Sequence, residues 1–282
     1  MIIDSHCHGV AGFGLTDPWT GQSLLARYLQ RAQAAGITHS VIFANFHDDY
    51  AKANQQVAQF VRQHPQRLMG LCYLHAGRDK GRIFSMLKTA VEDYGFVGIK
   101  VHRHDARITR EICDAARVFR VPILYDVETE LDVLDWLARN YPDLNFIVPH
   151  LSSFAEKWRS QTVFLDRLEA YPNLYTDTSG VRFFDLLMRV VERCGPHKLL
   201  FGSDGPWLHP GVELAKIKAM GLAPQAQALV LGGNFLRLTG LSKPGGRAVV
   251  AGSIGSGAIT KTMRARVSLP AARRGAAAGS GR

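Results

Sequence analysis

Two histidines separated by a single residue stand near the start of the chain, in the run Met-Ile-Ile-Asp-Ser-His-Cys-His. An apolar strand is expected at residues 2–5. Because alternate side chains of a strand share a face, His6 and His8 point to the same side, where two imidazoles form half of a metal site. A metal-dependent enzyme is therefore the leading hypothesis, although a His-x-His pair alone is weak evidence.

The other strands predicted along the chain also end in residues that bind metals or move protons. These strand-end residues are Asn45 with His47, His75, Lys100 with His102, Asp126, His150 and Asp204. Nitrogen and carboxylate donors of this kind suit Zn2+ or a similar first-row divalent ion with one position open to water. A metal lowers the pKa of its bound water to about 7, and a neighbouring carboxylate can then accept the proton.

Strand-like and helix-like segments alternate along the chain, which is typical of repeated βα units around a parallel sheet. Strands are predicted at residues 2–5, 40–45, 68–74, 97–102, 123–127, 146–149, 174–176 and 199–203. Helices are predicted at residues 23–35, 50–64, 83–94, 110–119, 131–140, 155–170, 184–194, 212–220 and 224–238. Eight βα units close into an α/β fold of the (β/α)8 TIM-barrel type, whose catalytic residues sit at the C-terminal ends of the strands.

An open doubly wound sheet is the alternative fold. Such a sheet usually carries a glycine-rich phosphate turn after its first strand. Gly9, Gly12 and Gly14 do follow His8, but they lack the spacing of that fingerprint. The barrel is therefore preferred.

Composition is ordinary for a soluble globular protein that buries a core. Hydrophobic residues make up 46% and charged residues 21% of 282 positions, and no apolar run approaches the roughly 20 residues of a membrane span. The N-terminus has no basic stretch before an apolar core, so a cytoplasmic location and no membrane partner are expected. Four scattered cysteines without C-x-x-C spacing argue against a disulfide framework or a thiolate zinc cluster.

Most of the net charge of +10 comes from the C-terminal tail. Residues 243–282 contain no Asp or Glu and carry Lys243, Arg247, Lys261, Arg264, Arg266, Arg273, Arg274 and Arg282, which leaves +2 for residues 1–242. We therefore predict a barrel at residues 1–242 and a basic Gly/Ala/Arg-rich flexible tail at 243–282. Such a tail has no role, contacts an anionic polymer or surface, or is an artefact of reading frame. Nucleic acid is not an expected partner of the barrel itself.

Several segments resemble the amidohydrolase superfamily, in particular the amidohydrolase-related (amidohydrolase 2 type) metal-dependent TIM-barrel hydrolases and decarboxylases. The matching segments are Ile-Asp-Ser-His-Cys-His at 3–8, Val-Gly-Ile-Lys-Val-His at 97–102, Phe-Ile-Val-Pro-His at 146–150, Leu-Phe-Gly-Ser-Asp-Gly-Pro-Trp at 200–207 and Gly-Asn-Phe-Leu-Arg-Leu at 233–238. The resemblance covers residues 1–242. It is specific for the superfamily and unspecific for the reaction.

The resemblance implies roles for particular residues. His6 and His8 look like the metal ligands of the first strand, His150 like the histidine of the sixth, and Asp204 like the aspartate of the eighth, which contacts the metal and shuttles protons. The fifth strand departs from the pattern, since Asp126 stands where the family has a histidine.

The metal set therefore has two versions. If Asp126 binds, the ligands are His6, His8, Asp126 and Asp204, with His150 either binding the metal or donating a hydrogen bond to substrate. Otherwise the site holds metal weakly or works without one. Zn2+ is the expected ion, and Mn2+ is the alternative because an additional carboxylate favours ions that prefer oxygen ligands.

Three residues are assigned to substrate binding. Lys100 lies on an apolar strand, where its charge either faces the barrel mouth or is buried at high cost, so it is a candidate anchor for a carboxylate or phosphate. His102 shares its face, and Trp207 follows Asp204 at the same mouth. Three of the site candidates also have a simpler explanation: Lys100 as a solvated charge, His150 as an ordinary residue at a helix entry, and Asp204 as a turn former.

We therefore expect a metal-dependent hydrolase of a small organic substrate. It would cleave a C–O or C–N bond, as in a lactone or amide, with metal-activated water and with Asp204 and His150 as catalytic residues. The first alternative is non-oxidative decarboxylation of a small carboxylic acid, a reaction that the resembling branch includes. The second is a catalytically inactive barrel that acts as a binding protein. Barrels of this kind often pair, so a homodimer is compatible with the sequence.

Overall fold

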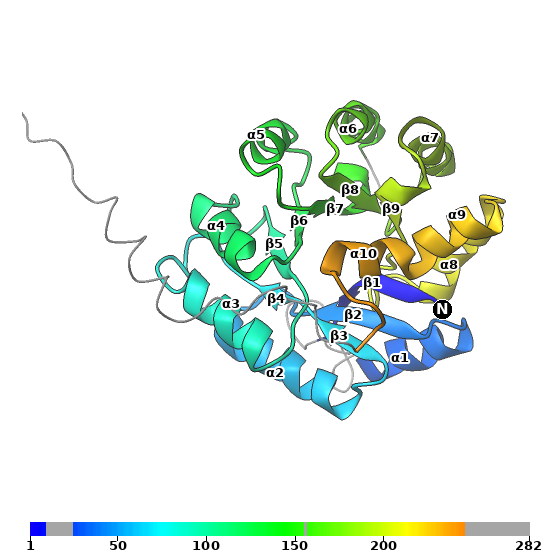
Figure 1. Cartoon of the computed structure of the whole chain (residues 1–282). Coiled ribbons are helices and arrows are strands. Elements are labelled where there is room, and N and C mark those ends of the chain that lie inside the picture. Colours follow the sequence, from blue (N-terminus) through cyan, green and yellow to red (C-terminus); the bar gives the residue numbers. More distant parts are fainter. Residues whose placement is uncertain (10–24, 155–156, 246–282) are drawn as a thin grey trace, which may run out of the picture. The chain divides into compact units, whose positions relative to one another are not determined.

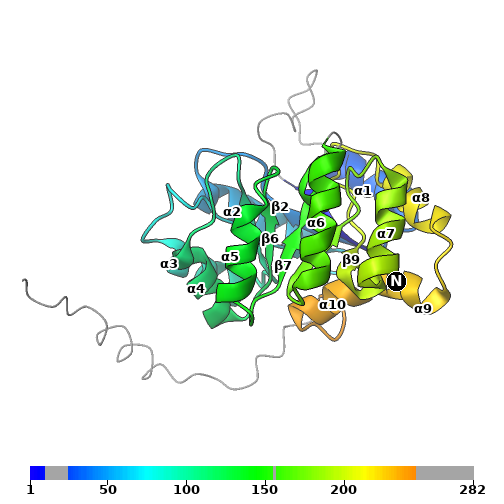
Figure 2. The same ribbon diagram turned by 90° about the horizontal axis from the view of Figure 1, so that it is seen from above.

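The structure, a computed structural model, describes residues 1–9, 25–154 and 157–245. In this part of the chain the strands form an inner ring and the helices pack outside it (Figure 1). A view turned by 90° shows the strands and the helices around them with roughly parallel axes (Figure 2). The predicted (β/α)8 class is confirmed.

The inner ring is built from parallel strands that follow the order of the sequence. The strand segments are β1 (Ile3–His8), β2 (His39–Phe43), β3 (Leu68–Gly70), β4 (Cys72–Tyr73), β5 (Ile99–His102), β6 (Ile123–Asp126), β7 (Phe146–Val148), β8 (Leu174–Asp177) and β9 (Leu199–Leu200). Only Leu71 separates β3 from β4, so the two segments occupy one place in the ring. The eight strands predicted from the sequence thus match eight places.

The ring closes where β1 meets the chain that follows β9. The amide of Ser5 donates to the carbonyl of Phe201 (2.9 Å) and the amide of His8 donates to the carbonyl of Gly205 (2.6 Å). Between them, the amide of Asp204 donates to the carbonyl of His6 (2.8 Å). The closure therefore places the last predicted strand end directly beside the first.

The outer helices cover the ring, and their sequences explain where they begin and which face is buried. They are α1 (Leu25–Ala34), α2 (Tyr50–Gln63), α3 (Ile83–Glu92), α4 (Arg110–Phe119), α5 (Asp132–Asn140), α6 (Trp158–Ala170), α7 (Phe184–Cys194) and α8 (Pro210–Ala219). Asp49 caps α2 by accepting hydrogen bonds from the amides of Ala51 and Lys52. In α4 the buried residues recur at helical spacing, at Ile112, Cys113, Ala115 and Ala116.

The last predicted helix, residues 224–238, is divided. It consists of α9 (Pro224–Ala228), a π-helical segment (Leu229–Gly233) and α10 (Asn234–Thr239). A Cβ at Gly232 would lie 3.0 Å from Cγ1 of Ile3, the first residue of β1. The interruption thus allows the backbone to pack closely against the N-terminal end of the barrel, opposite the end where the predicted site residues lie.

Some predictions fall outside the described residues. These are the first two positions of the helix predicted at 23–35, the first two of that predicted at 155–170, and the tail from residue 246 onward. Within the described residues, no helix combines the length and apolar character needed to cross a membrane.

Candidate metal centre and active site

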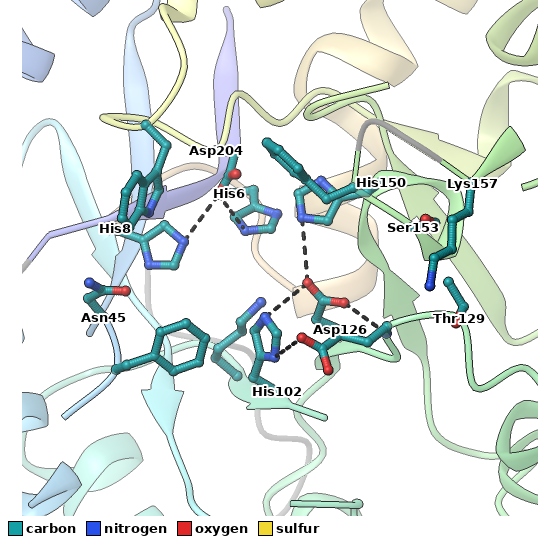
Figure 3. A pocket seen from close by; sticks show the side chains of 15 residues that line it. His6, His8, Asn45, His102, Asp126, Thr129, His150, Ser153, Lys157 and Asp204 are labelled. Carbon is teal, nitrogen blue, oxygen red and sulfur yellow. Dashed lines mark hydrogen bonds and ion pairs between the residues drawn. The ribbon is translucent and has the colours of Figure 1, made fainter. Parts of the chain in front are cut away.

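A cavity of about 520 Å3 opens at the C-terminal ends of the strands (Figure 3). It is lined by His6, His8, Asn45, Phe46, Lys100, His102, Asp126, Glu128, Thr129, His150, Ser153, Phe154, Lys157, Asp204 and Trp207. Every residue that the sequence analysis assigned to catalysis, metal binding or substrate binding is in this set. Within the cavity these residues divide into two groups with different contacts.

The first group joins the two ends of the ring. Oδ1 of Asp204 lies 3.1 Å from Nε2 of His8 and 3.3 Å from Nε2 of His6. All three side chains are buried, and one ligand atom from each lies within 4.8 Å of the other two. Among the described residues this is the group whose geometry suits a metal ion.

Nδ1 of each histidine contacts an acceptor behind the ring, which leaves Nε2 of each available to bind a metal ion. Nδ1 of His6 is 2.8 Å from Oδ2 of Asp177, the last residue of β8, and Nδ1 of His8 is 3.4 Å from the carbonyl of Ala44. Because a carboxylate and a carbonyl only accept, each Nδ1 carries the proton and each Nε2 presents its lone pair. Two imidazoles and a carboxylate, oriented from behind by such partners, form the usual donor set of a catalytic divalent metal with open positions.

The charge states of this group also fit a metal. Burial lowers the pKa of His6 to about 4, against the opposing attraction of Asp177, so its ring is neutral at pH 7. Burial likewise lowers the pKa of His8. Burial alone would raise the pKa of Asp204, but its contacts with His8, His6 and His150 outweigh burial and hold the pKa below its usual value, so the carboxyl stays ionised.

The backbone at Asp204 adopts an unusual conformation. Its φ of 56° is in the left-handed region, which a non-glycine residue rarely occupies. Two hydrogen bonds hold the segment: from the Asp204 amide to the carbonyl of His6 (2.8 Å), and from the Ser203 amide to Oδ1 of the buried Asp4 (2.8 Å). These contacts turn the carboxylate toward the two histidines.

The second group belongs to β5, β6 and the turn after β7. Oδ2 of Asp126 lies 3.2 Å from Nε2 of His102 and 3.6 Å from Nε2 of His150. Register explains the first contact, since His102 and Asp126 are paired across β5 and β6. Burial opposes ionisation of Asp126, but the adjacent His102 holds the pKa of the carboxyl well below its usual value. Asp126 is not part of the three-residue group that suits a metal.

Lys100 lines the same cavity, and carboxylates of both groups act on its charge. The side chain is 1% exposed, and its ammonium lies 5.0 Å from the ring centroid of Phe43. None of the described residues accepts a hydrogen bond from this ammonium. Burial lowers the pKa of Lys100, against the attraction of Asp126, Asp204 and Asp177. A buried cation without an acceptor suits an anionic group that enters from the cavity.

The mouth of the cavity is aromatic. Trp207 and Phe154 are each 47% exposed and line it, while Lys157, Thr129 and Ser153 lie on the side far from His8 (Figure 3). Sequence analysis assigned Trp207 to this mouth but did not assign a role to the other four.

Asp177 contacts His6 in this site, and sequence analysis missed it. The predicted strand stopped at Thr176, one residue short of the observed end of β8. A carboxylate at a strand end, like Asp126 and Asp204, was the available signal.

Solved structures share the fold at low sequence identity. The 5-carboxyvanillate decarboxylase of Sphingomonas paucimobilis is 14% identical, with a TM-score of 0.68, over 86% of this chain and 99% of that one. A dihydroxybenzoic acid decarboxylase of Polaromonas sp. JS666, with bound manganese and 2-nitroresorcinol, is 16% identical, with a TM-score of 0.64, over 86% of this chain and 97% of that one. The 4-oxalomesaconate hydratase of Rhodopseudomonas palustris is 19% identical, with a TM-score of 0.63, over 85% and 95%.

Comparison at the level of sequence families agrees with the resemblance noted above. The sequence has no significant match among curated proteins. The family model described as Amidohydrolase, in contrast, matches residues 3–241, which include the strands and helices of the described barrel. The chain therefore belongs to this amidohydrolase family.

Proposed function

We propose that the protein is a metal-dependent enzyme that removes a carboxylate, without oxidation, from a small aromatic or conjugated acid. The single observation that carries the proposal is the convergence of His6, His8 and Asp204 on one point, beside the buried Lys100. That arrangement offers both a metal and a fixed positive charge to an acidic substrate. The decarboxylases with similar folds act on aromatic acids, which supports the choice of reaction.

His6, His8 and Asp204 would hold the ion. We propose a first-row divalent ion, for which Zn2+ suits the imidazole nitrogens and Mn2+ is the ion bound in a structure of similar fold. When bound, the metal supplies a Lewis acid that holds substrate oxygen and draws off negative charge.

The remaining chemistry belongs to the chain's own residues. The Lys100 ammonium receives a substrate carboxylate or phenolate, and the aromatic side chains at the mouth enclose the ring. His150 donates from Nδ1 to the carbonyl of Ser179 (2.7 Å), so its Nε2 faces the cavity and can hold a proton. When the carbon–carbon bond to the carboxylate breaks, its electron pair stays on the substrate carbon, which takes that proton from His150 as carbon dioxide leaves.

Hydrolysis of a lactone or amide is the second candidate. The observation that favours it is the ionised Asp204 carboxylate, which lies within 3.3 Å of both metal-facing imidazole nitrogens. That carboxylate is placed to accept a proton from a water molecule beside His6 and His8. The two reactions differ in whether carbon dioxide is released.

The test begins with elemental analysis and continues with assays on small aromatic acids, lactones and amides, in the presence of Mn2+ or Zn2+. We expect bound metal and release of carbon dioxide, with one deuterium incorporated at the vacated carbon when the reaction runs in D2O. Asp204→Asn removes activity, whereas Asp79→Asn, a change at a buried carboxylate outside the cavity lining, retains it.

Release of an acid from a lactone or amide without carbon dioxide would support the second candidate instead. A protein that binds no divalent metal and turns over none of these compounds would favour the inactive binding barrel.

A further inference from the structure

Asp126 replaces the histidine expected at the end of the fifth strand, and both of its carboxylate oxygens are engaged within the protein. Oδ1 accepts a hydrogen bond from the amide of Glu128 (3.1 Å). Oδ2 faces Nε2 of His102 (3.2 Å) and Nε2 of His150 (3.6 Å). Figure 3 shows the carboxylate between these two rings, on the side of the cavity away from His8.

The proton of His102 is directed at Asp126. Nδ1 of His102 accepts a hydrogen bond from the backbone amide of His104 (3.1 Å), so this nitrogen carries the lone pair. The neutral ring must then carry its proton on Nε2, where it donates to Oδ2 of Asp126. Nε2 of His102 is therefore unable to bind a metal ion in this tautomer.

His150 faces the same oxygen, Oδ2 of Asp126, but in the other tautomer. Its Nδ1 donates to the carbonyl of Ser179, so the neutral ring has a lone pair on Nε2. Nε2 of His150 faces the cavity 3.6 Å from Oδ2 of Asp126, so the carboxylate also limits where the cavity side of this ring can lie.

We propose that Asp126 is a positioning residue and not a metal ligand: it fixes the ring of His102 and the position of the His150 ring beside the cavity. The part that concerns turnover rests on the proposed function. The replacement of histidine by aspartate thus leaves a centre of three protein ligands, His6, His8 and Asp204, because the carboxylate turns toward the other two imidazoles.

Metal affinity tests the first half without any substrate. Asp126→Asn and Asp204→Asn are matched changes of carboxylate to amide in one cavity, and the affinity of each purified variant for Mn2+ and for Zn2+ is measured by competition with a chromogenic chelator. We expect Asp126→Asn to lower the affinity by less than about tenfold, the smallest loss typical of an outer partner, and Asp204→Asn to lower it by more than about 100-fold. Equal losses in the two variants would overturn the proposal.

Histidine ring signals test the second half, again without substrate. In 15N-edited NMR spectra of the wild-type protein we expect His102 in the Nε2-protonated form and His150 in the Nδ1-protonated form. Asp126→Ala removes the acceptor, so the His102 signals shift toward the average of the two tautomers, while the His6 and His8 signals stay in place. Unchanged His102 signals would contradict the proposal. If Asp126→Ala does not fold by circular dichroism, Asp126→Ser makes the same test.

Kinetics separate this proposal from the proposed function. With an acid that releases carbon dioxide, we expect Asp126→Asn to lower kcat by about 100-fold, the lower range for loss of proton-transfer catalysis, with KM nearly unchanged, and Asp126→Glu to recover part of it. An unchanged kcat would overturn the role assigned through His150. If no acid is turned over at all, the proposed function fails, yet the affinity and NMR results still decide whether Asp126 is a ligand.

Discussion

The cavity has two walls that contain the same residue types but differ in chemistry. The β1 wall consists of His6, His8 and Asp204, and the β6 wall consists of His102, Asp126 and His150. In each wall one carboxylate oxygen lies within 3.6 Å of two imidazole nitrogens. In the β1 wall the distant nitrogens donate to Asp177 and Ala44, so both near nitrogens offer lone pairs. In the β6 wall the backbone amide of His104 donates to Nδ1 of His102, so Nε2 of His102 donates to Asp126.

The difference teaches that the partner behind a histidine decides what the histidine does. An acceptor behind the ring exposes a lone pair suited to a metal, whereas a donor behind it exposes a proton suited to a carboxylate. Both walls combine two imidazoles and one carboxylate at the C-terminal ends of strands. The contrast lies at His102, because His150 also has an acceptor, the Ser179 carbonyl, behind its ring. The predictions below break or sharpen this comparison.

The largest effect is expected at the carboxylate of the β1 wall. Asp204→Asn leaves a neutral amide among the metal-facing nitrogens, so metal affinity falls by more than about 100-fold, beyond the usual cost of losing an outer partner. Activity falls with it. Elemental analysis after dialysis measures the loss, and a variant that retains one ion per chain would contradict the assignment.

The next effect is a change of stability with pH, caused by Asp4, a buried carboxylate beneath the β1 wall. Burial raises the pKa of Asp4 from 3.8 to about 6, despite hydrogen bonds from Ser203 and Tyr28. A folded pKa above the unfolded one means that the contribution of Asp4 to stability is fully present below pH 4 and is lost as pH rises through 6, by about 3 kcal/mol in all.

The Asp4→Asn variant has no carboxyl group that titrates at this position. In the metal-free proteins, the free energy of unfolding of the wild type relative to the variant therefore decreases by about 2 kcal/mol between pH 4 and pH 7. Urea denaturation at several pH values measures it. Parallel curves for the two proteins would show that Asp4 is not buried as described.

A smaller effect is expected behind His6. Asp177→Asn keeps the size of the side chain but removes the negative charge that orients the ring, so metal affinity falls by about 10- to 100-fold. The same chelator competition measures it. Asp79→Asn, at a buried carboxylate that does not line the cavity, is the control and leaves the affinity in place. If the two variants behave alike, the partner behind the ring does not matter.

The smallest effect is expected between the walls. Lys100→Met removes the buried ammonium and keeps a side chain of similar length, so KM for an acidic substrate rises about tenfold, roughly 1.4 kcal/mol, while metal affinity is retained. Steady-state kinetics measure KM for the acid, and inhibition of the same reaction measures the binding of its uncharged amide. An equal loss of binding for both compounds would mean that Lys100 does not bind an anion.

Much of the barrel could be predicted from the sequence because each strand is a short apolar run that ends in a polar residue. Alternation placed His6 and His8 on one face, and the closure of eight βα units placed Asp204 beside them. The division of the last helix at Gly232 was not predicted, since it depends on close approach to Ile3, which lies far away in the sequence.

The chemical roles of individual side chains were harder to predict from the sequence than the fold. Asp126 was expected as a metal ligand because its position in the strand is that of a family ligand, and no pattern in the sequence reveals that a backbone amide turns the His102 proton toward it. Asp177 was missed because one residue decided whether the strand ended at Thr176 or after it. Both cases depend on contacts between strands and on which ring nitrogen carries hydrogen.

Diffraction from crystals soaked with Mn2+ tests the central claim most directly, because the anomalous signal locates the ion independently of any assay. The account predicts one peak per chain, about 2.0 to 2.3 Å from Nε2 of His6, Nε2 of His8 and a carboxylate oxygen of Asp204. A peak at Asp126 and the imidazoles of the β6 wall, or no peak in the cavity at all, would contradict it.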